Sequence, residues 1–267
     1  MIARMVAFAM ASFAAGVSAA QDVVRIYAAG SLREAMTEMV QAFASPAGTT
    51  VTTVFGPSGI LREWIEKGED AHVFASADLS NAQALARTGR AAAPVVFARN
   101  RLCALTAPGV EVESKTLLER MLDPKIKLGT STPKADPSGD YAWQLFEKAE
   151  KVRPGAYASL DAKALKLVGG AVDSPQQPAS RSVYAGLIGE RKADIFLTYC
   201  TNAIAAMREV QGAKMVEIPD DLAVGATYTL AVMNDAPPAA MRFALYILST
   251  PGQTILRRYG FTPVTLP

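Results

Sequence analysis

Short apolar strands alternate with amphipathic helices along most of this chain. Residues 23–28 have the apolar, β-branched composition of a strand, and residues 31–43 follow with apolar side chains three or four positions apart, as on one face of a helix. The same pair recurs at residues 50–55 and 59–67, and the pattern continues to a closing helix at residues 252–259. This alternation predicts an α/β fold with mainly parallel sheets, because parallel strands need long crossover connections.

The size and composition of the chain narrow the classes of protein further. It has 267 residues, with 27 basic and 25 acidic side chains, one histidine and two cysteines. That length suits one large or two medium-sized domains. The near balance of charge provides no field of the kind that nucleic-acid binding needs, so we expect no nucleic-acid partner. The scarcity of histidine and cysteine excludes a four-cysteine cluster or a polyhistidine metal centre, and we expect neither a cofactor nor a free metal ion.

Residues 1–20 have the pattern of a secretory signal peptide. Arg4 supplies the positive charge, residues 5–16 form an uncharged apolar stretch, and small residues at 17–20 offer a cleavage site. The apolar stretch is short for a membrane span, and no stop-transfer flank follows, which disfavours the alternative of an uncleaved anchor. We expect an exported, soluble mature protein.

Cys103 and Cys200 would then share a compartment that permits disulfides. Two cysteines allow a single pairing, but their spacing does not show whether the Cα atoms come close enough to form it. Two buried thiols are the alternative, because free cysteine is commonly buried. The sequence leaves both states open.

Serine residues recur where predicted helices begin. Ser31 and Ser58 each follow a predicted strand, Ser138 begins the predicted helix 138–151, and Ser180 precedes the predicted helix 182–190. A serine at such a junction lies beside the unpaired N–H groups and the positive dipole end of the helix. In open α/β sheets these junctions form the ligand crevice. If they converge they would bind an anion, although a serine in this position often only caps its helix.

Enzymatic alternatives find less support. The chain has no G-x-S-x-G elbow, no Walker loop and no G-x-G-x-x-G turn. A hydrolase could use Ser58 or Ser31 as the nucleophile, but its base would have to be His72, the only imidazole, which we interpret as structural. An exported regulatory or adhesive domain without a small ligand is a third alternative. The segment 169–180, with two prolines and two glutamines, is interpreted as a surface loop rather than a lid.

Several segments together resemble one known family. They are AAGSL at 28–32, GPSG at 56–59, AHVFASAD at 71–78, DPSGDYA at 136–142, ADIFLTY at 193–199 and RYGF at 258–261. These segments resemble the periplasmic molybdate-binding proteins of ABC importers, which have the type II periplasmic binding fold. The resemblance extends over residues 23–263, nearly the whole mature chain.

The resemblance implies a protein of two α/β lobes, each a mainly parallel sheet flanked by helices, joined by two hinge crossings. Lobe one would contain residues 22–98 and 220–267, and lobe two residues 99–219. A small oxyanion would bind between the lobes and favour their closed arrangement. The expected partner is an ABC permease of the inner membrane, and the expected form is a periplasmic monomer without a cofactor.

The resemblance also implies a set of ligand-binding residues. Lobe one would contribute Ser31 and Ser58, and lobe two the Ser138 N–H and the Tyr199 phenol. Either Ser180 or Arg181 would provide the remaining contact. These donors suit a fully deprotonated tetrahedral dianion, molybdate or tungstate, and penalise a protonated phosphate. A sulfate-like anion or a ferric ion held by tyrosines is the alternative ligand.

Overall fold

The computed structural model describes residues 23–47, 49–170 and 181–264. The predicted signal peptide, Ser180 and most of the segment 169–180 lie outside these residues, so the signal peptide and the interpretation of that segment stay predictions. None of the helices within the described ranges combines the length and the apolar character needed to cross a membrane.

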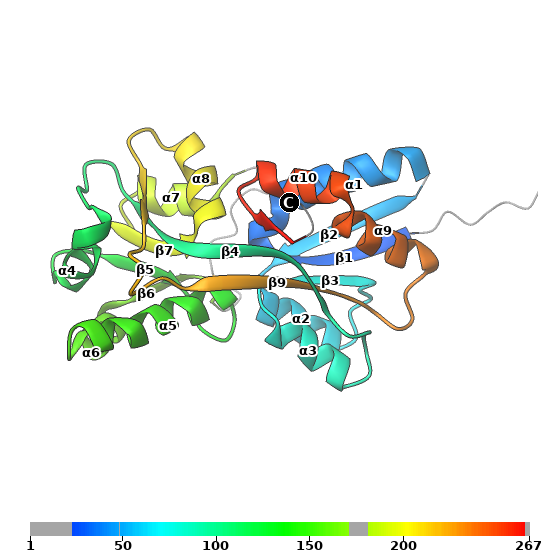
Figure 1. The fold of residues 1–267 in the computed structure, drawn as a ribbon, viewed down its shortest axis with the longest axis horizontal. Coiled ribbons are helices and arrows are strands. Elements are labelled where there is room, and N and C mark those ends of the chain that lie inside the picture. Colours follow the sequence, from blue (N-terminus) through cyan, green and yellow to red (C-terminus); the bar gives the residue numbers. More distant parts are fainter. Residues whose placement is uncertain (1–22, 48, 171–180, 265–267) are drawn as a thin grey trace, which may run out of the picture.

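Two groups of three parallel strands form the two ends of the sheet (Figure 1). In the first group, β1 pairs in parallel with a strand on either side. Its members are β1 (Val23–Ala29), β2 (Thr50–Gly56) and β3 (Val73–Ser76). In the second group, β5 takes the same central place. Its members are β5 (Leu128–Ser131), β6 (Leu165–Val168) and β7 (Ile195–Tyr199).

Two strands connect these groups: β4 (Val95–Thr106) and β9 (Gly225–Val232). The strand order is β2-β1-β3-β9-β4-β7-β5-β6, and β4 pairs with β9 through residues 95–101 and with β7 through residues 102–106. All pairs made by β4 and β9 are antiparallel, so the sheet is parallel within each end and mixed as a whole. Short strands β8 (Lys214–Glu217) and β10 (Thr262–Pro263) also pair with β4.

Helices cover both faces of each end of the sheet (Figure 1). Those around the first group are α1 (Arg33–Ala47), α2 (Ser58–Glu66), α3 (Ser80–Arg87), α9 (Pro238–Leu248) and α10 (Thr250–Arg258). Those around the second group are α4 (Leu117–Leu122), α5 (Pro137–Val152), α6 (Ala156–Lys163), α7 (Val183–Gly189) and α8 (Cys200–Glu209). The two-lobed α/β fold expected from the sequence is therefore confirmed. The residue boundaries expected for the lobes stay a prediction.

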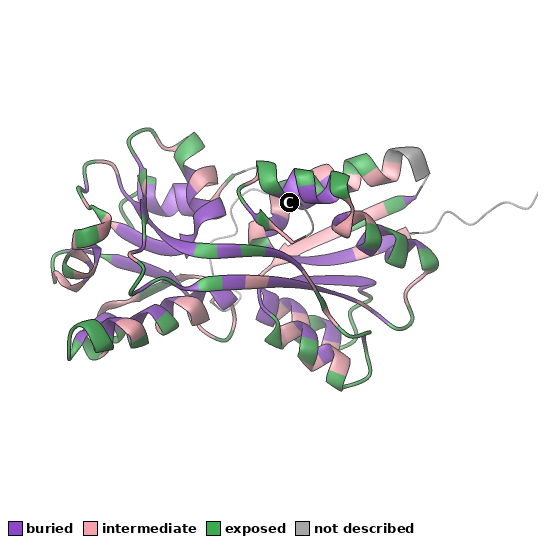
Figure 2. Ribbon diagram, in the orientation of Figure 1, coloured by how far each residue is buried: buried purple, intermediate pink, exposed green. Residues whose placement is uncertain are grey.

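The core lies along the strands, while the outer faces of the helices are exposed (Figure 2). Most of its large side chains are apolar, as burial without hydrogen bonds requires. Tyr199 and Tyr228 are exceptions, because they are fully buried on the two strands β7 and β9. Their hydroxyls need partners, and both strands end or pass where the two lobes meet.

A disulfide joins Cys103 of β4 to Cys200, the first residue of α8. Their Cα atoms are 4.9 Å apart. Of the two states that the sequence leaves open, the structure therefore has the bridge. Because Cys200 directly follows Tyr199, the disulfide anchors the start of α8 and the end of β7 to the connecting strand.

Replacing both cysteines, as Cys103→Ser together with Cys200→Ser, should lower the free energy of unfolding by about 2–4 kcal/mol. The bridge joins residues 97 positions apart, and it restricts the unfolded chain more strongly as that separation grows. Urea denaturation under non-reducing conditions measures the difference. Wild type in excess reductant should match the double variant, and equal midpoints for oxidised wild type and the variant would contradict the prediction.

Candidate functional site

Ser31 follows β1 in a short 3-10 turn, Gly30–Leu32. Its Oγ lies 2.7 Å from the hydroxyl of Tyr228 on β9, and either atom can be the donor. A pair of hydroxyls uses one O–H between its members and leaves the other O–H for a further acceptor. This pair can therefore donate one hydrogen bond into the space that Ser31 faces.

Ser58 is the first residue of α2 and is buried. Its Oγ accepts a hydrogen bond from the backbone N–H of Ala77, which follows β3, at 3.1 Å. Accepting this bond leaves the serine O–H as a donor. Pro57 occupies the preceding N-cap position in extended conformation and cannot contribute an N–H.

Ser138 is the second residue of α5 and differs from the expectation. Its backbone N–H, which the resemblance assigns to the anion, donates to Oδ1 of Asp136 at 3.0 Å. Asp136 is the N-cap of α5, and an aspartate there accepts from the first-turn N–H groups. The Ser138 Oγ is buried and has no hydrogen-bond partner within the part of the chain that the structure describes.

Tyr199 ends β7 and presents a second buried polar atom without a partner among the described residues, its hydroxyl. Its ring meets those of Tyr141 and Tyr228 edge-on, with centroids 6.2 Å and 5.5 Å apart. Burial raises the pKa of Tyr199 well above its ordinary value, so the phenol stays protonated and can donate.

The two lobes touch at these junctions. The backbone N–H of Gly59 donates to the carbonyl of Ala135 at 3.1 Å, and the Tyr141 hydroxyl donates to the carbonyl of Ala77 at 3.4 Å. Ser138 lies one helical turn before Tyr141 on α5, so it faces the same way. A continuous set of contacts thus connects three of the residues that the sequence singled out, Ser31, Ser58 and Tyr199, and Ser138 lies on the same helix as Tyr141 of this set.

The remaining predicted contact is not part of this set. Ser180 lies outside the described residues. Arg181 is 61% exposed, and its Nε lies 3.5 Å from a carboxylate oxygen of Glu209 at the end of α8. The structure therefore gives the Arg181 side chain an acidic partner of its own, apart from the four residues above.

Sequence reasoning missed three residues of this region: Tyr141, Tyr228 and Asp136. Tyr228 lies in a predicted strand without a motif, and its contact with Ser31 joins residues 197 positions apart. Asp136 and Tyr141 lie within the DPSGDYA segment, but only Ser138 was selected from it. The available signal was that Asp136 and Tyr141 are polar residues on either side of Ser138 in this segment.

Asp136 brings negative charge to the site. Burial raises its pKa from 3.8 to about 6; the Ser138 N–H lowers it, while the charges of Asp140 and Asp78 raise it further. Asp78 is stabilised by its own turn, where Ser76, Ser80 and the Asn81 amide donate to its carboxylate. The site thus combines neutral hydrogen-bond donors with three acidic residues, Asp78, Asp136 and Asp140.

His72 is placed away from these groups. It precedes β3, where its Nδ1 accepts from the Arg25 N–H at 3.1 Å and its Nε2 lies 3.3 Å from an Asp70 oxygen. Ser58 is bonded to Ala77, beyond the opposite end of β3. The length of this strand, roughly 3.3 Å per residue, separates the imidazole from the serine. A Ser58–His72 nucleophile and base pair is therefore not formed.

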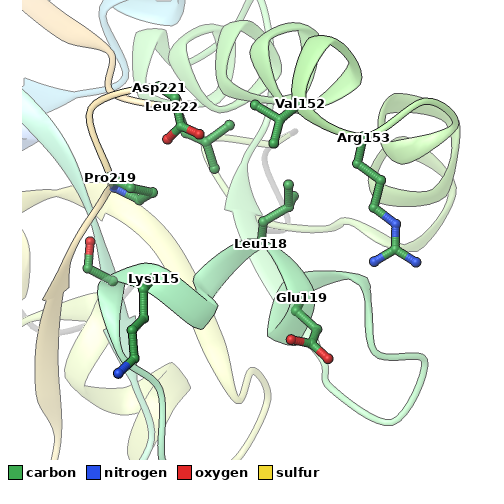
Figure 3. Close-up of a pocket in the computed structure, with 9 residues that line it drawn as sticks. Lys115, Leu118, Glu119, Val152, Arg153, Pro219, Asp221 and Leu222 are labelled. Atoms are coloured by element: carbon green, nitrogen blue, oxygen red, sulfur yellow. The ribbon is translucent and has the colours of Figure 1, made fainter.

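A hollow of about 440 Å³ lies elsewhere, beside α4 and the end of α5 (Figure 3). Leu118 and Val152 form its apolar part, and Lys115, Glu119 and Arg153 its charged part. A smaller depression of about 260 Å³ lies between the lobes at Asp78 and Tyr141. Only the smaller one adjoins the serine junctions.

An α/β fold of two lobes with polar groups gathered between them defines the class of solute-binding proteins. Residues 24–262 match the model of the bacterial extracellular solute-binding protein family, and this chain belongs to that family. An uncharacterized protein of Pasteurella multocida is 38% identical over 242 residues, covering 90% of this chain and 98% of the relative. The molybdate-binding protein ModA of Escherichia coli is 25% identical over 270 residues, which are 97% of each chain.

Solved structures show the same fold. The periplasmic molybdate-binding protein of Azotobacter vinelandii has a TM-score of 0.71 and 17% identity, with 91% of this chain and 99% of that chain covered. The sulfate-binding protein SubI of Mycobacterium tuberculosis has a TM-score of 0.75 and 18% identity, with 92% of this chain and 88% of that chain covered. Iron-bound HitA of Pseudomonas aeruginosa has a TM-score of 0.64 and 16% identity, with 91% of this chain and 86% of that chain covered. At these identities the likeness is one of fold alone, while the similarity to molybdate-binding proteins read from the motifs is confirmed.

Gly59→Ala should hold the lobes further apart. An added Cβ would lie 2.4 Å from the Lys134 carbonyl oxygen and 2.9 Å from that of Ala135, both on lobe two, although alanine suits the helix itself. Small-angle X-ray scattering should show a larger radius of gyration than wild type with no loss of thermal stability. Gly30→Ala, with no atom within 4 Å of its Cβ, is the matched control. A radius equal to that of the control would contradict the prediction.

Proposed function

We propose that this protein is exported to the periplasm, binds molybdate or tungstate between its two lobes and delivers the anion to an ABC permease. The observation that carries this proposal is that two of the four buried polar atoms without partners among the described residues are the Tyr199 hydroxyl and the Ser138 Oγ. A buried polar group without a hydrogen bond costs about 1–3 kcal/mol, which a ligand that accepts hydrogen bonds would recover.

The chemistry of the donors supports a fully deprotonated anion. Ser31 with Tyr228, Ser58 and Tyr199 can each direct an O–H toward the region between the lobes. Molybdate and tungstate accept hydrogen bonds at every oxygen and bring no proton of their own. An anion bound by neutral donors also needs no ion pair, which agrees with the balanced charge of the chain.

The lobe boundaries, the oligomeric state and the route of export belong to the same proposal. Lobe one would contain residues 22–98 and 220–267, and lobe two residues 99–219. Closure on the anion would create the surface that the permease recognises. The protein would act as a monomer without a cofactor, after removal of residues 1–20.

A ferric ion is the competing ligand, and one observation favours it. The sequence pointed to Tyr199 alone, but the structure brings Tyr141, Tyr228 and the Asp136 carboxylate to the same region. Phenolate and carboxylate oxygens are hard ligands suited to such a cation. Against it, burial raises the pKa of Tyr199 and of Tyr228 well above the ordinary value, which opposes the phenolate form that a ferric ion needs.

Calorimetry on the protein purified from the exported fraction tests these ligands. Molybdate and tungstate should bind tightly, and sulfate, phosphate and ferric citrate weakly or not at all. Tyr199→Phe should weaken molybdate binding by about 1–3 kcal/mol, the value of a hydrogen bond to a charged acceptor. Tyr157→Phe on α6 is the matched control and should bind as wild type does. Absence of oxyanion binding, or an unchanged affinity of Tyr199→Phe, would contradict the proposal.

A further inference from the structure

Asp136 competes with the expected ligand for one donor. It lies in the loop between β5 and α5, and its Oδ1 accepts the Ser138 N–H at 3.0 Å. The same N–H is the one that the resemblance assigns to the anion. An anion that reaches Ser138 must therefore lie beside this carboxyl group.

The backbone of Gly169 keeps the carboxyl group in place. Gly169 has a φ of +70°, and a Cβ added there would lie 2.6 Å from Cβ of Asp136 and 3.2 Å from its Oδ2. The chain at the end of β6 therefore packs directly against the aspartate, which cannot turn in that direction. Positive φ and close approach together explain why this position is a glycine.

The groups that face Asp136 do not neutralise it. Asp140 on α5 and Asp78 after β3 are acidic, and both raise its pKa. Tyr184 on α7, Tyr199 on β7 and Tyr228 on β9 also face it, and burial raises the pKa of all three, so they stay neutral. Lys134 lies in the same loop, but its charge and its N–H act on Asp140.

We propose that a single proton lies between Asp136 and the bound oxyanion, and that the Asp136 carboxyl group takes it up when a fully deprotonated anion binds. This inference rests on the proposed function, because it concerns the anion bound at Ser138 and Tyr199. A dianion and an ionised carboxylate at hydrogen-bond distance repel each other, whereas one shared proton converts the contact into a charge-assisted hydrogen bond. Molybdate brings no proton, so the protein takes one from solution onto the carboxyl group and returns it when the anion leaves.

The sign of the pH dependence follows from the free carboxyl group. Burial raises the pKa of Asp136 to about 6, so the unliganded protein is mostly ionised there at pH 7 and above. Binding molybdate then requires proton uptake, and its affinity falls as the pH rises, approaching tenfold per pH unit.

The substitution Asp136→Asn removes the titratable carboxyl group and keeps the helix cap. Asparagine caps a helix as well as aspartate does, and its amide oxygen can still accept the Ser138 N–H. Its NH₂ group can donate to the anion at any pH. Asp161→Asn on α6 is the matched control, because Asp161 is exposed, accepts from the Trp143 Nε1–H and does not act on Asp136.

Calorimetry of the exported protein with molybdate, between pH 6.5 and 8.5 and in two buffers of different ionisation enthalpy, measures affinity and proton uptake together. Wild type and Asp161→Asn should take up close to one proton per molybdate and lose affinity by about tenfold per pH unit at the alkaline end. Asp136→Asn should take up none and bind with a constant affinity that exceeds that of wild type at pH 8.

The outcomes distinguish this inference from the proposed function. Molybdate binding by wild type without proton uptake, or an equal pH slope in Asp136→Asn, would overturn the role of Asp136 and leave oxyanion binding standing. Binding by Asp136→Asn alone would contradict both, because the natural chain would then not bind the anion even where its carboxyl group can take up a proton. If neither protein binds any oxyanion at any pH, both the proposed function and this inference are wrong.

Discussion

The pairing of β4 with both ends of the sheet is the constraint on which the rest of the structure depends. One continuous strand of twelve residues bonds to β9 through its first half and to β7 through its second. Leu102 lies opposite Tyr199 in that register, and Cys103 is bonded to Cys200 in the next position. The strand that joins the lobes therefore also sets the position of the tyrosine between them.

Local patterns made part of this molecule predictable. The α/β class and the helix starts at Ser58 and Ser138 depend on apolar spacing and on capping within a few residues. The helices α4, α6 and α8 and the strands β6, β8 and β10 were not predicted. α8 begins directly after β7 without a turn residue, and β6 is a short, largely exposed edge strand. Such elements are specified by tertiary packing rather than by local pattern.

The residues of the candidate site likewise fall into those that local sequence patterns indicate and those that only tertiary contacts bring together. The serines were visible because they lie at strand-to-helix junctions, which repeat along the chain. The bond from Ser31 to Tyr228 and the packing of Gly169 on Asp136 join residues far apart in the sequence, so no local spacing indicates them. Asp136 before Pro137 has the pattern of an ordinary helix cap, and only its place within the field of Asp78 of the other lobe gives it a second role.

Closing the lobes has opposite effects on the two kinds of polar group in the site. Neutral donors gain from closure, because an enclosed anion would satisfy hydroxyls such as that of Tyr199 and would be shielded from water. Acidic groups lose from it, since Asp136 of one lobe then lies within the field of Asp78 of the other. An occupant that accepts hydrogen bonds and leaves Asp136 protonated satisfies both at once. Under the proposed function, the approach of Asp78 to Asp136 on closure would therefore favour such a ligand.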